Sequence, residues 1–156
     1  MTWEEDFWVD FIGKIQGRYS TIWQSVELFR DALHCFGGGG YLGTCVMCRA
    51  SVEALLHLAR TRHGVQGFLA PETTWGQLET WASRKGLLKG IKRRVDRVHK
   101  SGNFSAHLAQ RIDLGYTTIS LRRTPRPLLR LDKEVAANRI IETSDIIVKV
   151  TERRWP

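Results

Sequence analysis

Apolar residues near the N-terminus recur every three to four positions, which predicts two amphipathic helices within residues 1–36. The first carries an aromatic-rich stripe of Trp3, Phe7, Trp8 and Phe11. The second carries a stripe of Ile22, Val26, Phe29 and Leu33. Ser20 or Thr21 precedes this second stripe as the expected N-cap. The aromatic density indicates a core or a dimer interface more than a ligand cage.

The four glycines from Gly37 to Gly40 are expected to stop the second helix. A glycine run can cradle a phosphate, but a P-loop also needs a Lys-Ser or Lys-Thr pair after its last glycine. No such pair follows here, so we interpret the run as a flexible connector.

The clearest helical pattern runs from about Tyr41 to Arg62, and Gly64 is expected to close it. Its apolar stripe consists of Cys45, Cys48, Val52, Leu55 and Ala59. Further apolar residues widen this stripe, namely Val46, Ala50, Ala54 and Leu58. Small residues on several faces indicate a central helix that is contacted from more than one side. Arg49 and Glu53 lie four residues apart on it, either as an exposed ion pair or as a half-buried pair that faces a site.

The second half of the chain predicts three more helices. A short one is expected within residues 73–86, and a longer one begins around Leu87 and is interrupted at Gly102. The last spans about residues 133–152. Residues 116–131 alternate apolar and polar positions and contain two prolines, which favours a short β-hairpin or an ordered loop.

The pattern as a whole predicts an all-α bundle of about five helices in a single domain, residues 1–156. Hydrophobic residues make up 42% of the chain and include six tryptophans, enough for a core in a domain of this length. No apolar run approaches the roughly 20 residues of a membrane span. The acidic start Met1–Asp6 does not resemble a secretory signal, so we expect a cytoplasmic protein with no membrane partner.

The cysteines do not indicate a disulfide framework, because their number is odd and Cys45 and Cys48 lie in an apolar stretch. The Cys-x-x-Cys spacing also occurs in zinc sites, but no second pair and no histidine at ligand spacing accompany it. We expect both thiols to be small core residues. The sequence predicts neither a metal nor another cofactor.

The chain has 24 Lys and Arg against 16 Asp and Glu, which gives a net charge of +8 and an isoelectric point near 9.9. This balance favours anionic partners, and nucleic acid before a membrane surface because no basic amphipathic anchor is visible. The expected nucleic-acid-binding residues are Lys92, Arg93, Arg94, Arg97, Arg122 and Arg123.

The segment from Gly102 to His107 combines a glycine, small residues and two polar groups. Asn103 and His107 lie four residues apart, so they share a face if the helix continues after Gly102. Gly102 permits either a turn or the close approach of another segment. The two polar side chains therefore either cap helix ends or are presented to a ligand.

Two motifs carry a resemblance to a known family. Cys48-Arg49-Ala50-Ser51-Val52-Glu53 on a long helix, a short helix and then Gly102-Asn103-x-x-Ala106-His107 resemble helical domains of unknown function found beside restriction endonucleases and other defence genes. That family is similar to the HEPN superfamily of helical bundles, which commonly dimerise. The resemblance covers roughly Tyr41 to His107, with the last helix fitting in position. It implies a HEPN-like bundle that acts with RNA, as a homodimer or as a subunit of a defence complex.

Many HEPN proteins are metal-independent ribonucleases whose signature is an Arg followed after four to six residues by a His. By this resemblance, the acid/base is His107, the orienting group is Asn103 and the phosphate contact is Lys100. A histidine exchanges protons near neutral pH, and attack by the RNA 2′-OH needs no metal. The residues expected to support this group are Arg49, Glu53 and His99.

The sequence departs from the family signature at the basic position. Lys100 stands where the six-residue spacing before His107 calls for Arg, and lysine lacks the bidentate grip of a guanidinium on phosphate. Arg94 and His99 form a second match. In the family a polar residue often stands next to the Arg, whereas Val95 stands there in this chain.

Two functions therefore stay open. One is a HEPN-like RNA-binding domain of a prokaryotic defence system, with or without metal-independent endoribonuclease activity. The other is a non-catalytic interaction or scaffold subunit that docks a partner protein or nucleic acid in a larger complex. In the second case Gly102, Asn103 and His107 hold a helix junction, and the arginines form a solvated face.

Overall fold

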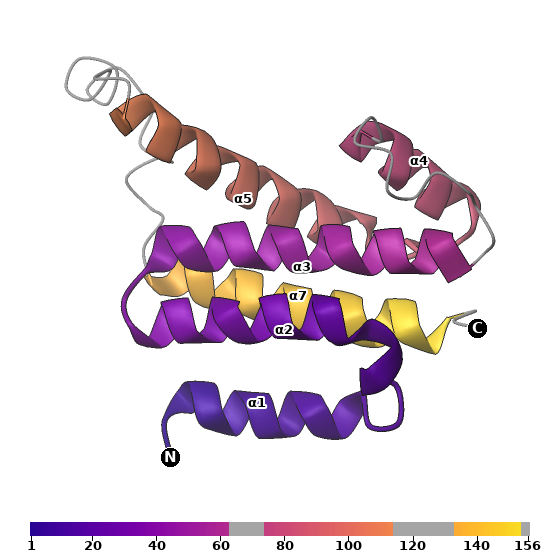
Figure 1. Ribbon diagram of the computed structural model, residues 1–156, viewed down its shortest axis with the longest axis horizontal. Coiled ribbons are helices and arrows are strands. Elements are labelled where there is room, and N and C mark those ends of the chain that lie inside the picture. The colour runs from indigo at the N-terminus through magenta and orange to yellow at the C-terminus, as the bar shows by residue number, and fades with distance from the viewer. Residues whose placement is uncertain (63–73, 114–132, 154–156) are drawn as a thin grey trace.

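The computed structural model describes residues 1–62, 74–113 and 133–153, with side chains up to Ala106 in the middle stretch. The described residues form six helices and no strand (Figure 1). These are α1 (Trp3–Lys14), α2 (Tyr19–Gly37), α3 (Tyr41–Arg62), α4 (Trp75–Arg84), α5 (Lys92–Asp113) and α7 (Lys133–Glu152). The all-α expectation is confirmed for these residues, with one helix more than the five expected. The hairpin or loop expected at 116–131 lies outside them.

Helix α1 forms where the aromatic stripe predicts it. Thr2 caps it through a capping box: the Thr2 side chain accepts from the amide of Glu5, and the Glu5 carboxylate accepts from the amide of Thr2. Phe11 is buried and packs edge-on against Phe29 of α2, with ring centroids 4.8 Å apart. Aromatic packing therefore fixes α1 along α2.

The expected N-cap of α2 is wrong, although its apolar stripe is buried as predicted. The helix begins at Tyr19, one or two residues before the positions proposed as caps, and no side chain caps it. Thr21 lies inside the helix, and its hydroxyl donates to the carbonyl of Arg18 at 2.7 Å. The backbone kinks at Ile22, where φ is −128° and ψ is 18°.

Helices α2 and α3 form an antiparallel hairpin, the most extensive packing in the bundle (Figure 1). The glycine run joins them, as expected: α2 ends at Gly37, and Gly39 adopts a φ of 78° that suits glycine. Two buried serines connect the helices. The hydroxyl of Ser25 donates to the carbonyl of Ser51 at 2.9 Å, and the hydroxyl of Ser51 donates to the carbonyl of Ser25 at 2.7 Å.

Helix α3 is the centre of the bundle and contacts α2, α4, α5 and α7, which confirms the prediction of a helix covered from several sides. All five residues of its expected stripe are buried. By length and composition it is the one described helix that could cross a membrane. A buried core helix of a soluble protein passes the same test, so this is weak evidence for a span.

The long helix expected from Leu87 begins later and continues further than predicted. Residues 85–91 form turns, with Gly86 at φ 75° and Gly90 at φ 78°, and α5 starts at Lys92. The expected interruption at Gly102 is wrong, because α5 runs without a break to Asp113. Gly102 instead allows α5 to approach α3 closely.

Helix α7 has the predicted bounds and closes the bundle against α3, α5 and α2 (Figure 1). Arg139 of α7 donates to the hydroxyl of Ser101 on α5 at 2.9 Å and to Glu142 at 2.6 Å. Glu142 also accepts from Arg97 of α5 at 2.9 Å. The α5–α7 contact therefore combines a buried apolar face with an ion-pair network at its edge.

Candidate functional site

The site is built where α5 crosses α3, and Gly102 sets the distance between them. A Cβ at Gly102 would lie 2.8 Å from the carbonyl oxygen of Cys45 and closer still to the Cβ of Arg49. No side chain fits there without displacing α3 backbone. Glycine is therefore required in the middle of α5 despite its poor helix propensity.

Arg49 and Glu53 lie beside this crossing on one face of α3. The Arg49 Nε donates to the Glu53 Oε1 at 2.9 Å, and the two side chains are 26% and 29% exposed. The pair is therefore half-buried and not an exposed ion pair, while its facing a functional site stays a prediction. A partly desolvated pair of this kind holds both groups in one orientation more firmly than an exposed pair does.

His99 of α5 completes a cluster with this pair. Its Nε2 lies 3.7 Å from the Glu53 Oε1, beyond ordinary hydrogen-bond length. The side chain is 14% exposed, and Nε2 is shielded from solvent. The imidazole is thus held near a carboxylate and a guanidinium by electrostatics and packing.

Trp75, the first residue of α4, covers the imidazole. The indole and the imidazole of His99 stack with centroids 4.1 Å apart and planes inclined by 7°. Thr74 fixes this position of Trp75, because it caps α4 in a capping box with Gln77. Three helices therefore meet at His99 of α5. Helix α3 supplies Arg49 and Glu53, and α4 supplies Trp75.

Burial lowers the pKa of His99 below its ordinary value of 6.5, and the positive charge of Arg49 lowers it further. The carboxylate of Glu53 opposes this shift, as do the more distant Glu79 and Asp96. At neutral pH the imidazole is therefore uncharged and able to accept a proton.

The structure describes the side chains of only some of the residues first expected to carry chemistry. The backbone of α5 continues through Asn103 and His107, so the two positions lie one turn apart on one helix. Asn103 is half-buried one turn after His99, and Lys100 is exposed. The side chain of His107 lies outside the described residues, so its role stays a prediction.

Three of the expected nucleic-acid contacts are engaged in ion pairs within the chain. Lys92 pairs with Glu79 at 2.8 Å and with Asp96 at 3.6 Å. Arg94 pairs with Asp145 at 3.3 Å and Arg97 with Glu142 at 2.9 Å.

Such pairing reduces what these three cations offer to an external phosphate. Arg93 is exposed, like Lys100, and no ion pair ties either of them to another described residue. Arg122 and Arg123 lie outside the described residues. The exposed cations of α5 are therefore the ones most open to an anionic partner.

Cys45 and Cys48 are buried, as expected of small core residues. Burial raises the pKa of Cys45 to about 11 and that of Cys48 to about 12, which makes both thiols poor nucleophiles and poor metal ligands at neutral pH. Among the described residues, no group of three or more His, Cys, Asp or Glu could hold a metal ion.

Trp75 is the site residue that sequence reasoning missed. Its distance in sequence from His99 gives no periodic signal, because the contact depends on how α4 folds back over α5. The sequence did predict a short helix within residues 73–86, which contains Trp75. It could not predict which side chain that tryptophan covers.

Comparison with known proteins gives no relative from which the role of the site can be taken. The chain matches no protein-family model, and neither curated proteins nor solved structures give a significant match. The class of protein is therefore defined by its geometry: an all-α bundle with a half-buried Arg-Glu-His cluster under a tryptophan.

Proposed function

We propose that the chain is a HEPN-like RNA-binding domain of a prokaryotic defence system, whose Arg49–Glu53–His99 cluster takes part in metal-independent RNA cleavage. The observation that carries this proposal is the meeting of a guanidinium, a carboxylate and an uncharged imidazole at the junction of three helices. The net charge of +8 supports an anionic partner. The resemblance of the two motifs to HEPN-like defence proteins supports RNA as that partner.

The cluster has the groups that such a reaction needs. A neutral imidazole can take the proton of an RNA 2′-OH, whose oxygen then attacks the adjacent phosphorus. The bond from phosphorus to the 5′-oxygen breaks, and the leaving oxygen takes up a proton. The products are a 2′,3′-cyclic phosphate and a 5′-OH. Arg49 or the exposed Lys100 would stabilise the charge that develops on the phosphate.

Access to the imidazole sets a condition on this proposal. His99 Nε2 is shielded and Trp75 covers the ring, so RNA reaches it only if Trp75 moves aside. A flat indole can then stack on an unpaired base, as aromatic residues do in many RNA-binding proteins. His107, two turns further along α5, is the second candidate for proton transfer.

The test is incubation of single-stranded RNA with the protein in chelator. We expect products that end in 2′,3′-cyclic phosphate from the wild type, and a loss of about 100-fold or more in rate for His99→Ala. His34→Ala is the matched control, because His34 is exposed on α2. Loss in His107→Ala alone would assign the proton transfer to His107. Circular dichroism of each variant checks that the fold is retained.

A non-catalytic docking subunit is the second candidate, and two observations favour it. His99 Nε2 is shielded, and ion pairs within the chain engage Lys92, Arg94 and Arg97. This candidate predicts RNA retention at low salt without cleavage, and retention that weakens steeply as salt increases. If the protein neither cleaves nor retains RNA, RNA is excluded as its partner.

A further inference from the structure

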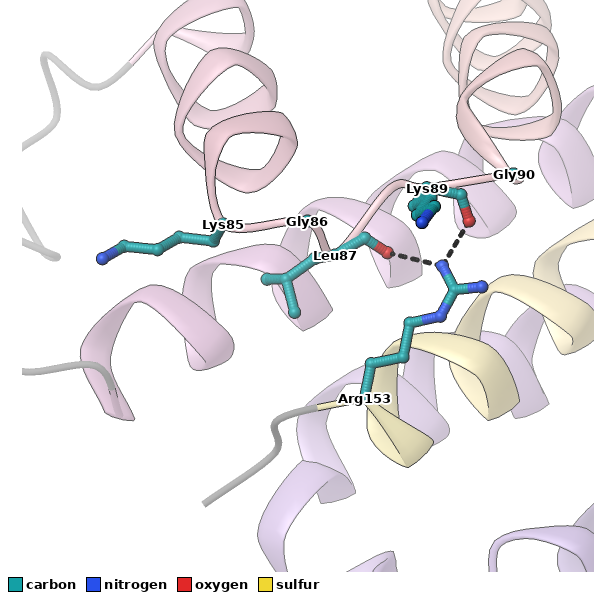
Figure 2. Close-up of a pocket in the computed structure, with 6 residues that line it drawn as sticks. All are labelled: Lys85, Gly86, Leu87, Lys89, Gly90 and Arg153. Carbon is teal, nitrogen blue, oxygen red and sulfur yellow. Dashed lines mark hydrogen bonds between the residues drawn. The ribbon is translucent and has the colours of Figure 1, made fainter.

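A hollow of about 620 Å³ lies between the turn that joins α4 to α5 and the C-terminal end of α7. Its lining consists of Lys85, Gly86, Leu87, Lys89, Gly90 and Arg153 (Figure 2). Three of these residues are cationic and none is acidic. The volume lies within the range of sites that hold small ligands.

Arg153 is anchored in this hollow by the backbone of the turn. Its Nη1 donates to the carbonyl of Leu87 at 3.4 Å and to the carbonyl of Lys89 (Figure 2). Both hydrogen bonds use one nitrogen, so Nη2 and Nε have no acceptor among the described residues and can donate to a ligand. An arginine already held in place loses little side-chain entropy when it binds an anion.

The shape of the turn depends on two glycines with left-handed backbone. Gly86 has a φ of 75° and Gly90 a φ of 78°, and an added Cβ at either would meet no atom within 4 Å. Both glycines are therefore needed for conformation, and the space around them is open. Lys85 and Lys89 are exposed and leave the turn in different directions (Figure 2). Lys85 points away from Arg153 in Figure 2, so its flexible side chain has to turn for its charge to face an anion there.

We infer that this hollow, here named the Arg153 hollow, is a binding site for a phosphate group. Arg153 is the anchored donor, since a guanidinium matches the geometry of phosphate oxygens. Lys85 and Lys89 are the flexible cations that complete the charge balance.

A second hollow, of about 410 Å³ between α1 and α2, provides a contrast. Its lining includes the acidic Glu4 and Glu5 as well as Arg30, so it would not favour an anion. The lining of the Arg153 hollow, by comparison, contains cations and no acidic residue. The inference goes beyond the proposed RNA cleavage, because a free phosphate, a nucleotide and an RNA backbone all present the same group.

The experiment uses ¹⁵N-labelled full-length protein titrated with pyrophosphate and, separately, with inorganic phosphate. We expect the amide resonances of residues 85–90 to shift together. In Lys85→Gln/Lys89→Gln, the dissociation constant for pyrophosphate should increase about fivefold or more. Arg30→Gln/Lys133→Gln is the matched control, because it removes the same charge at exposed positions on α2 and at the start of α7, away from the hollow, and its constant should change less than twofold.

The inference is overturned if pyrophosphate leaves the resonances of residues 85–90 in place, or if both double variants weaken binding equally. Arg153→Gln should also weaken pyrophosphate binding. If Arg153→Gln unfolds, the comparison of the two double variants decides whether the hollow binds phosphate. A short single-stranded RNA that displaces pyrophosphate would assign the phosphate to a nucleic-acid backbone, and an RNA that does not would assign it to a small ligand. Both results support a phosphate site. Cleavage in chelator is measured separately, so either proposal can fail alone.

Discussion

The indole of Trp75 lies face to face with the imidazole of His99, and this contact joins the start of α4 to α5. The same contact covers the imidazole, whose Nε2 is shielded from solvent and lies 3.7 Å from Glu53 of α3. One aromatic stack thus joins two helices and adds to the burial that lowers the pKa of the histidine. Removing the indole separates these two effects.

Trp75→Ala should raise the pKa of His99 toward 6.5, because burial is the largest cause of its lowered value. The measurement is a pH titration of the histidine side chains by ¹H–¹⁵N correlation spectroscopy. The ring protons of His99 should also move downfield when the ring current of the stacked indole is lost.

Trp23→Ala is the control for this titration, since Trp23 is 51% exposed on α2. It should leave the pKa of His99 unchanged. A His99 pKa that stays low in Trp75→Ala would show that Arg49, and not burial under the indole, sets it.

Gly102→Ala should destabilise the protein although alanine favours helix. The added Cβ meets the Cys45 carbonyl at 2.8 Å and the Cδ of Arg49 at 2.9 Å. Overpacking costs about 1–3 kcal/mol, and the upper part of that range applies here because the clash is with α3 backbone. Alanine returns about 1 kcal/mol of helix propensity, so we expect a net loss of up to about 2 kcal/mol. Urea denaturation monitored by circular dichroism measures the free energy of unfolding.

Gly13→Ala is the matched variant, because Gly13 lies in α1 and an added Cβ there meets no atom within 4 Å. It should be neutral or raise the free energy of unfolding by up to about 1 kcal/mol. Equal effects of the two alanines would contradict the close approach of α3 and α5 at Gly102.

Hydrophobic periodicity predicted most of the fold because each long helix buries one apolar stripe. The bounds of α3 and α7 agree with the pattern, since their stripes run without interruption between glycine and charged ends. Gly102 misled the prediction, because a glycine required for helix–helix contact looks the same in sequence as one that ends a helix. The N-cap of α2 was missed because the helix begins at Tyr19 without a side-chain cap, and the hydroxyl of Thr21 bonds back to the carbonyl of Arg18.

The site could be predicted only where its residues are close in sequence. Arg49 and Glu53 share a helix face, so their spacing predicts their ion pair. His99 was a secondary candidate, and its place beside Glu53 depends on the register between α5 and α3, which no local pattern encodes.

Acid should destabilise the protein over the range in which the half-buried His57 and His99 titrate. Burial lowers the pKa of His57 and of His99 below 6.5, so the unfolded chain binds protons more readily than the folded one. The free energy of unfolding should therefore have its full value above about pH 6.5 and decrease as the pH falls below it. Urea denaturation at a series of pH values between about 7.5 and 5 measures this dependence.

The double variant His57→Gln/His99→Gln tests the origin of that slope. It should flatten the decrease, whereas His34→Gln on the exposed surface of α2 should leave it as in the wild type. A free energy of unfolding that increases toward pH 5 would contradict the burial of these imidazoles.

Thiol reactivity should distinguish the three cysteines of the chain. Cys45 and Cys48 are fully buried, and burial raises the pKa of each well above the ordinary value of 9.0, so neither forms the reactive thiolate at neutral pH. Cys35 is partly exposed near the end of α2. A disulfide reagent at pH 7.5 should therefore modify Cys35 first, and Cys35→Ser should remove this fast phase.

Modification of Cys45 and Cys48 should follow the unfolding transition in urea, because the reagent reaches them only when α3 leaves the core. Fast modification of the Cys35→Ser variant without denaturant would show that the centre of the bundle opens in the native state.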